Sequence, residues 1–218
     1  KFFFLLLYSS LIFGFFINEN LNYGSFIDWE ENRLVIINFS NDLLGTLLNY
    51  DTYGHRHSPL YLVFLSFFYK LGFSLDLIRL VHLHLCLGLV LIFYKCLKLK
   101  FEYVDKEILK ILSLVVILSP TFRSISIWPD TRLPGLILFI LSVYYFLKFL
   151  YSLKYKYVWL CSIWLIISSY ISPNFSFFSI YFYFIFYKKL NINKFSKLIL
   201  FNLVASIPIL FYLFFLDI

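Results

Sequence analysis

Long runs of apolar residues, separated by short polar stretches, dominate this sequence. Seven of the runs approach or reach the roughly 17 to 25 residues that a helix needs to cross a bilayer. They occupy residues 2–17, 76–97, 107–127, 133–150, 157–172, 174–187 and 198–216. A backbone inside a bilayer must satisfy its own hydrogen bonds, so such runs fold as helices. They predict an all-α, polytopic transmembrane helix bundle of about seven spans, in which "SPN" at 172–174 supplies a turn.

The composition agrees with a membrane environment. Hydrophobic residues make up 61% of the chain and charged residues only 14%, against roughly 25% in an ordinary soluble domain. All three cysteines, Cys86, Cys96 and Cys161, lie inside apolar runs, where cysteine acts as a small hydrophobic residue. Neither a disulfide nor a metal site is therefore expected. The absence of methionine leads us to expect that residues 1–218 are one transmembrane module of a longer protein.

Lysine positions predict which ends of the spans face the cytoplasm. Lysine collects in short cytoplasmic loops, and twelve of the thirteen lysines after Lys1 fall in three patches, at 95–110, 148–156 and 188–197. These patches share one side with Lys1 only if residues 58–72 do not cross the bilayer. Residues 18–75 then form a long first extracytoplasmic loop containing interfacial helices. We expect a multi-pass protein of a bacterial inner membrane with a cytoplasmic N-terminus.

Arginine follows a different pattern from lysine. In this arrangement every arginine falls on the outer side, together with eight of the acids. The arginines are Arg33, Arg56, Arg79, Arg123 and Arg132. Because guanidinium binds carboxylates and phosphates in a bidentate manner, two interpretations stay open. The arginines either pair with the neighbouring outer acids or form an outer-face site for an anionic ligand.

Several short motifs, in their order along the first 150 residues, resemble a known family. They are "DWEE" at 28–31, "HSPLY" at 57–61, "KLGFS" at 70–74, "LIRLVHLHL" at 77–85 and "SPTFRSISIWPDTR" at 119–132. This order resembles the GT-C superfamily of glycosyltransferases that use polyprenyl-phosphate-linked sugars, such as protein O-mannosyltransferases and lipid A aminoarabinose transferases. Two features depart from many relatives. Trp29 separates Asp28 from the glutamates, and Ser58-Pro59 replaces a proline pair.

The resemblance implies sugar transfer from a polyprenyl-phosphate donor to a glycan, lipid or protein acceptor on the extracytoplasmic face, with no nucleic-acid partner. Such chemistry requires a carboxylate near the acceptor and cations near the leaving phosphate. Asp28 is the first candidate for the carboxylate, with a loop acid or a helix cap as the alternative, and Glu30 or Glu31 is the second acid. Three other roles stay open for both glutamates: steering Arg33, binding a divalent cation, or simple solvation. No other cofactor is implied.

Arginines and histidines are the candidates for binding the substrate. Arg123 is the first choice for the donor phosphate, followed by Arg79 and Arg132, and Asp130 is an alternative partner of Arg132. His55 and His57 either contact the acceptor or phosphate, bind a metal, or belong to a simple loop. Within the span at 76–97, His82 and His84 point to different faces. One of them is expected to be a neutral hydrogen-bonding group inside the bundle.

Two classes of protein without chemistry of their own compete with this interpretation. A transporter or flippase-like protein would show internal repeats and helices interrupted near the midplane. A structural or assembly protein of cell-envelope polysaccharide synthesis would carry the outer acids and arginines as solvated surface. Substituting the outer acids one at a time separates an enzyme from an assembly protein.

Overall fold

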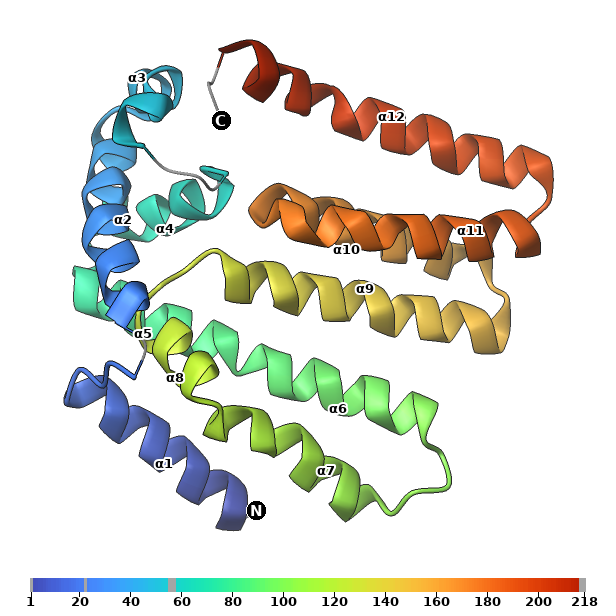
Figure 1. The fold of residues 1–218 in the computed structure, drawn as a ribbon, viewed down its shortest axis with the longest axis horizontal. Helices are drawn as coiled ribbons and strands as arrows, with labels where there is room; N and C mark the ends of the chain where they lie inside the picture. The colour runs from blue at the N-terminus through green and yellow to red at the C-terminus, as the bar shows by residue number, and fades with distance from the viewer. Residues whose placement is uncertain (1, 22, 55–57, 216–218) are drawn as a thin grey trace.

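The computed structural model describes residues 2–21, 23–54 and 58–215, and within these ranges it contains only helices, turns and irregular connections (Figure 1). The α-helices are α1 (Phe2–Phe16), α2 (Tyr23–Asn41), α3 (Leu43–Leu48), α4 (Leu60–Lys70), α5 (Leu75–Cys86), α6 (Gly88–Lys100), α7 (Lys106–Leu114), α8 (Pro120–Ile127), α9 (Arg132–Ser152), α10 (Tyr155–Ile171), α11 (Ser179–Lys189) and α12 (Ile192–Phe215). Short 3-10 helices are η1 (Tyr50–Tyr53), η2 (Val115–Leu118) and η3 (Pro173–Phe178). The all-α prediction is confirmed for this part of the chain.

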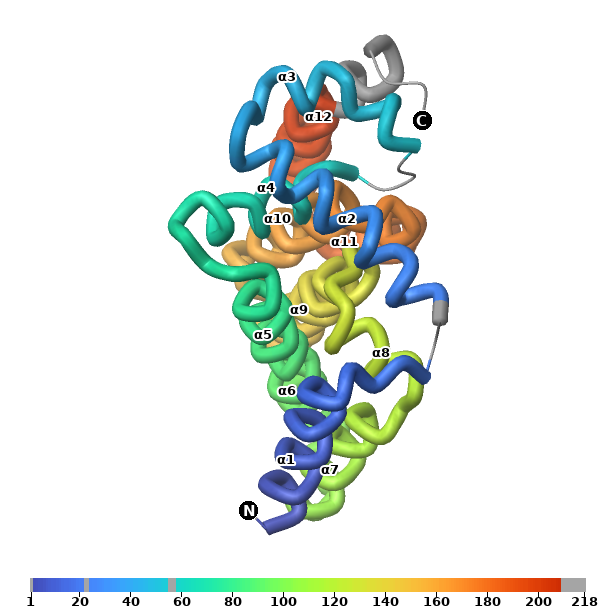
Figure 2. Tube along the Cα trace, turned by 90° about the vertical axis from the view of Figure 1, so that its left-hand side faces the viewer, coloured from blue at the N-terminus to red at the C-terminus, as the bar shows by residue number. Residues whose placement is uncertain are grey.

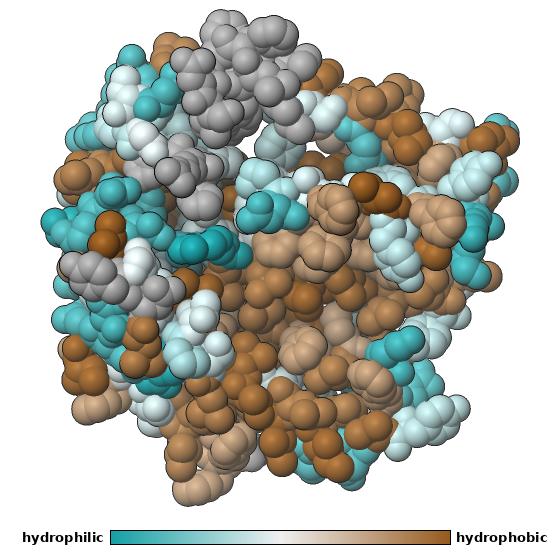
Figure 3. All heavy atoms as spheres, in the orientation of Figure 1, coloured by the Kyte–Doolittle hydropathy of each residue, from teal (hydrophilic) through white to brown (hydrophobic). Residues whose placement is uncertain are grey.

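The long helices lie side by side, and α2 runs across one end of them (Figures 1 and 2). The connections α6–α7, α9–α10 and α11–α12, which contain or adjoin the three lysine patches, lie together at the opposite end (Figure 1). The surface follows the same division. Apolar side chains cover the middle of the face in Figure 3, while polar side chains gather along its left and right margins.

Two helical stretches in the described residues are long and apolar enough to cross a membrane. They are Leu75–Lys100, which comprises α5 and α6, and Arg132–Ser152, which is α9. A third arises if the bent pair Lys106–Leu118 and Pro120–Ile127 counts as one span. By contrast, α1, α10 and α11 have 15, 17 and 11 residues, at or below the roughly 17 that a straight span needs. The expectation of about seven spans is therefore supported for two or three.

The predicted span at 107–127 is not one straight helix, because the chain bends by 65° between Leu118 and Pro120. Proline disfavours the helical conformation of the preceding residue, and Ser119 is extended, with φ −63° and ψ 125°. Its hydroxyl accepts a hydrogen bond from the Phe122 N–H, and Pro120 occupies the first turn of α8, where its missing N–H is harmless. One Ser-Pro pair thus ends η2 and starts α8 in a new direction.

The predicted outer loop at 18–75 is largely helical, since it contains α2, α3, η1 and α4. With 11 residues, α4 is roughly 16 Å long, well short of the roughly 30 Å of hydrocarbon in a bilayer. Whether residues 58–72 cross a membrane stays a prediction, because length alone does not exclude shorter apolar helices such as α1 and α4. The predicted turn at 172–174 is confirmed, because α10 ends at Ile171 and η3 begins at Pro173.

The buried apolar side chains form two clusters. The larger one joins α1, α2, α4, α5 and α8 and includes Leu11, Ile36, Leu65 and Ile78. The second joins α9, α10, α11 and α12 and includes Phe146, Phe149 and Phe186. All three cysteines are free and buried. The first cluster supports the charged groups at the α2 end of the molecule.

Candidate functional site

An open pocket of about 540 Å³ lies where α2 meets the ends of α1, α5 and α8. One face of α2 forms a wall with Phe26, Trp29, Glu30 and Arg33, because residues spaced by three and four positions share a helix face. The other walls consist of Asn18, Asn20, Leu75, Asp76, Arg79 and Trp128. Two acids, two arginines and three aromatic side chains therefore surround one space.

Glu30 and Arg33 form an ion pair within this wall. Arg33 Nη2 lies 2.6 Å from Glu30 Oε2, and both side chains are partly exposed. Arg33 Nε is buried and has no hydrogen-bond partner among the described residues. Exposed pairs of this kind contribute only about 0 to 1 kcal/mol, so a ligand can rearrange this pair at little cost.

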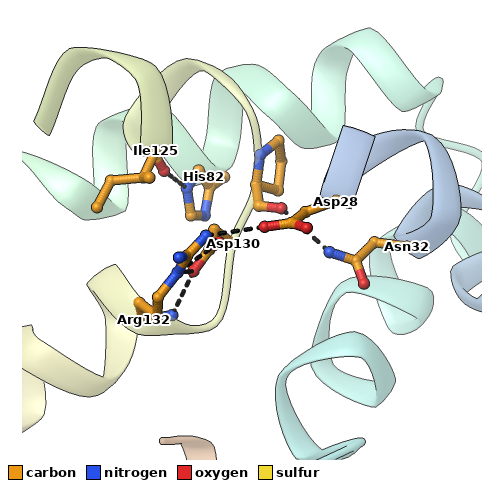
Figure 4. Close-up of polar contacts among 7 residues, drawn as sticks. Asp28, Asn32, His82, Ile125, Asp130 and Arg132 are labelled. Atoms are coloured by element: carbon orange, nitrogen blue, oxygen red, sulfur yellow. Dashed lines mark hydrogen bonds and ion pairs between the residues drawn. The ribbon is translucent and has the colours of Figure 1, made fainter. Parts of the chain in front are cut away.

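A second face of α2 packs against the segment that connects α8 to α9 (Figure 4). Asn32 Nδ2 donates to the Pro129 carbonyl at 3.5 Å, and Arg132 Nη2 lies 2.8 Å from Asp28 Oδ2. Asp130, only 2% exposed, accepts from the backbone N–H of Arg132 at 2.6 Å and from Arg132 Nε at 2.9 Å. Arg132 is thus shared by two carboxylates, and the predicted Asp130–Arg132 pair is confirmed.

The turn after α1 organises the floor of the site. The Asn18 N–H donates to the Phe15 carbonyl and the Glu19 N–H to the Gly14 carbonyl, while Asn18 has a φ of 54°. This is the Schellman pattern with asparagine in the left-handed position. The turn directs the Glu19 carboxylate onto Arg123, whose Nε donates to Oε1 at 2.7 Å and whose Nη2 pairs with Oε2.

The Glu19–Arg123 pair is almost enclosed, with side chains 14% and 11% exposed. Arg123 also donates from Nη2 to the Ser10 carbonyl at 3.0 Å, and neither Arg123 nor Glu19 lines the pocket. The Glu19 carbonyl in turn accepts from Trp128 Nε1 at 3.0 Å. A bidentate carboxylate therefore already occupies Arg123, which makes it a poorer candidate for a donor phosphate than Arg79 or Arg33.

Polar side chains on α5 satisfy the carbonyl groups at the end of α8, which lack partners within that helix. Arg79 Nε donates to the Ile127 carbonyl at 3.3 Å. Figure 4 shows the second contact, in which His82 Nε2 donates to the Ile125 carbonyl at 2.8 Å. Because a carbonyl only accepts, Nε2 carries the proton and Nδ1 accepts from the Tyr61 hydroxyl. Burial raises the pKa of Tyr61 well above its ordinary value, so the hydroxyl keeps its proton.

The two histidines of α5 confirm the expectation of different faces. His82 is fully buried and bonded as described. On the exposed face of α5, His84 Nδ1 donates to the Leu80 carbonyl at 2.8 Å, and Nε2 lies 2.9 Å from the Tyr8 hydroxyl. Both act as hydrogen-bonding groups between or within helices.

The remaining predicted residues fall outside the pocket or outside the described part. Glu31 is exposed on α2 and is not part of the pocket lining. His55 and His57 lie outside the described residues. Among the residues that the structure describes, no group of three or more histidine, cysteine, aspartate or glutamate side chains is arranged to hold a metal ion.

Sequence reasoning missed the roles of Glu19, Asp76 and Trp128. Glu19 directly follows the first apolar run, and Asp76 precedes Arg79 by three positions on a helix. The second spacing is a recognisable ion-pair signal. No local signal connects Glu19 to Arg123, which lies 104 residues away.

The described part of the chain is an all-helical, strongly apolar protein with a charged and aromatic pocket at one end of its long helices. Comparison with protein-family models, with curated proteins and with solved structures finds no match to the chain.

Proposed function

We propose that this chain is the transmembrane part of a GT-C-like glycosyltransferase that moves a sugar from a polyprenyl-phosphate donor to an extracytoplasmic glycan, lipid or protein acceptor. The observation that supports this function best is the pocket itself. Glu30 supplies a carboxylate, Arg33 and Arg79 supply guanidinium groups, and aromatic rings line the remaining wall. Proton transfer requires a carboxylate, and stabilisation of a leaving phosphate requires cationic groups such as guanidinium.

The proposal includes a topology of seven spans in a bacterial inner membrane. The spans are α1, α5 with α6, α7 with α8, α9, α10, η3 with α11, and α12, while α2, α3 and α4 lie at the outer interface. Its support is the position of the lysine-bearing connections at one end of the helices and of α2 at the other (Figure 1). The N-terminus is then cytoplasmic, and the pocket opens on the outer side.

Within this scheme the carboxylate that acts on the acceptor is Glu30, because it lines the pocket. Asp28 is the second candidate, since it lies on the adjacent face of α2 and is bound to Arg132. Arg79 and Arg33 face the pocket and hold the donor phosphate. Arg123 and Arg132 instead tie α1 and α2 to the segment around Trp128.

The topology predicts the labelling of cysteines placed on either side of α4. Cysteines at Asn49 and Lys70, which are both exposed, should both react with an impermeant thiol reagent in intact cells. A cysteine at the fully exposed Tyr103, in the α6–α7 connection, should react only after permeabilisation. The native cysteines are buried and give a low background. Labelling of only one of the first two would mean that α4 crosses the membrane and would overturn the scheme.

The function itself predicts a change in cellular glycans. Cells that lack the complete gene should accumulate one lipid-linked sugar and lose one glycan modification, both detectable by mass spectrometry. Complementation with the intact gene should restore the profile, whereas a variant that lacks the Glu30 carboxylate should not. An unchanged profile after deletion would exclude the proposed transfer reaction under the growth conditions tested.

An assembly protein is the second candidate, and one specific observation favours it. Each arginine in the described ranges has an acid partner: Arg33 with Glu30, Arg79 with Asp76, Arg123 with Glu19, and Arg132 with Asp28 and Asp130. The Arg123–Glu19 and Arg132–Asp28 pairs connect segments that are distant in the sequence without any ligand, whereas two of the other pairs lie within α2 and α5. The bend between α7 and α8 is a feature that a transporter would share, but the acids and arginines of the pocket lie at the α2 end of the helices.

A further inference from the structure

The guanidinium group of Arg79 makes three contacts besides those with Asp76 and Asn18. Its Nε donates to the Ile127 carbonyl at 3.3 Å. Its flat face lies over Trp128, 3.9 Å from the ring centroid, with the ring of Phe15 at 5.0 Å. The side chain is only 7% exposed. A backbone carbonyl and two aromatic rings therefore fix the position of the group before any ligand binds.

The other edge of the same guanidinium group is covered by two side chains that line the pocket. Nη1 donates to Asp76 Oδ1 at 3.0 Å, and Nη2 donates to Asn18 Oδ1 at 3.0 Å. Both partners are exposed, and the Asp76 side chain is 81% exposed. Two oxygens from exposed side chains thus occupy the fork that arginine offers to a phosphate.

We infer that Asp76 is an exchangeable counter-ion, which neutralises Arg79 until a phosphoryl group enters the pocket and takes the places of Asp76 Oδ1 and Asn18 Oδ1. This inference rests on the proposed function, because it assigns the donor phosphate to the fork of Arg79. An exposed aspartate loses little when it returns to water. The incoming anion gains a bidentate, charge-assisted contact with a guanidinium group that is already ordered.

A counter-ion differs from a ligand-binding or catalytic acid in the sign of its effect. A carboxylate that stays near the fork repels the incoming anion, so removing its charge should tighten anion binding. A carboxylate that contacts the ligand favourably would show the opposite. Asp76→Asn is a suitable change, because the amide oxygen can still accept from Arg79 Nη1 and preserve the packing.

The phosphoryl group could belong to a lipid or to free phosphate, and two probes distinguish these sources. Geranyl phosphate in detergent represents the lipid, and inorganic phosphate represents the free anion. Calorimetric titration of the purified full-length protein should show geranyl phosphate binding about tenfold tighter to Asp76→Asn, which is the size expected for one like charge at a partly solvated site. Tighter wild-type binding of geranyl phosphate than of inorganic phosphate would identify the lipid as the source, and equal affinities would identify the phosphate alone as the ligand.

The matched control is Glu107→Gln. Glu107 and Lys110 also form an exposed i,i+3 ion pair, but they lie in α7, which does not line the pocket, so this change should leave affinity unaltered. Arg79→Lys removes the fork and should weaken binding about tenfold, with thermal unfolding checking that the fold is retained.

Unchanged or weaker binding in Asp76→Asn, together with weaker binding in Arg79→Lys, would overturn the counter-ion role and leave the phosphate site of the proposed function intact. Equal binding by wild type and Arg79→Lys, or no binding by any form, would remove the phosphate from this fork altogether. Tighter binding in Asp76→Asn with an unchanged glycan profile after gene deletion would support the counter-ion role and reject the glycosyltransferase.

Discussion

Replacing Glu30 by glutamine should lower sugar transfer by a factor of about 10² to 10⁴, the usual contribution of a positioned general base. Glu30 lines the pocket, and its carboxylate is held by Arg33 at 2.6 Å. Glutamine has nearly the same shape, so the fold and the aromatic walls should persist while proton transfer is lost. The measurement is the transfer rate in membranes that contain the complete protein, at saturating donor.

The neighbouring acids serve as matched controls for this prediction. Glu31→Gln changes an exposed acid on the same helix, outside the pocket, and should leave the rate near that of the wild type. Asp28→Asn should have a smaller effect than Glu30→Gln, because Asp130 still binds Arg132. Loss of activity in Asp28→Asn alone would return the base role to Asp28. Full activity in both variants would exclude the two acids from the mechanism.

Replacing Glu19 by alanine should lower the free energy of unfolding by about 3 to 5 kcal/mol, the usual cost of removing one partner from a buried ion pair. The Arg123 side chain is only 11% exposed, so without Glu19 its charge lacks a counter-ion and has little contact with water. The same change removes the side-chain contact between the turn after α1 and α8, while the Glu19 carbonyl can still accept from Trp128 Nε1. Denaturant titration of the purified protein in detergent, followed by tryptophan fluorescence, measures the loss.

Gly14 leaves the space that the Glu19–Arg123 pair occupies, and replacing it provides an independent test of the contribution of this pair to stability. A Cβ at Gly14 would lie 2.2 Å from Glu19 Oε2 and 2.8 Å from Arg123 Nη2, so Gly14→Ala must displace the pair. Gly14→Ala and Glu19→Ala should then be strongly non-additive, because both act on one interaction. Gly88→Ala is the control, since its Cβ would meet only Ile137 Cγ2 at 4.0 Å. Stability losses that add fully, or an unaffected Gly14→Ala protein, would contradict this account.

The helices follow from the sequence to a large extent. The apolar run at 133–150 became α9, Arg132–Ser152, and the run at 76–97 became the continuous stretch Leu75–Lys100. The bounds of these helices depend on hydrophobicity along a segment, which is a local property. The bend at Ser119-Pro120 also had a local signal, because proline opposes a helical residue before it. The prediction of one span at 107–127 gave hydrophobicity more weight than this signal.

The site followed from the sequence only in part. Sequence patterns indicated that the acids and arginines gather on one side, and Arg79 and Glu30 do meet at the pocket. They also ranked Arg123 first for the phosphate, whereas the structure gives it the Glu19 carboxylate. For Arg123, the sequence had also left open a pairing with a neighbouring acid. That alternative describes its environment better than phosphate binding does.

Local chemistry by itself determined which segments are helical, which connections are basic, and which residue types collect at the α2 end, because each depends on neighbours within a few turns of chain. Only the tertiary structure decided which acid binds which arginine. Glu19 meets Arg123 and Asp28 meets Arg132 across 104 residues each. Such pairs depend on how the ends of α1, α2, α8 and α9 pack, and no short-range pattern specifies a contact made by the packing of distant helices.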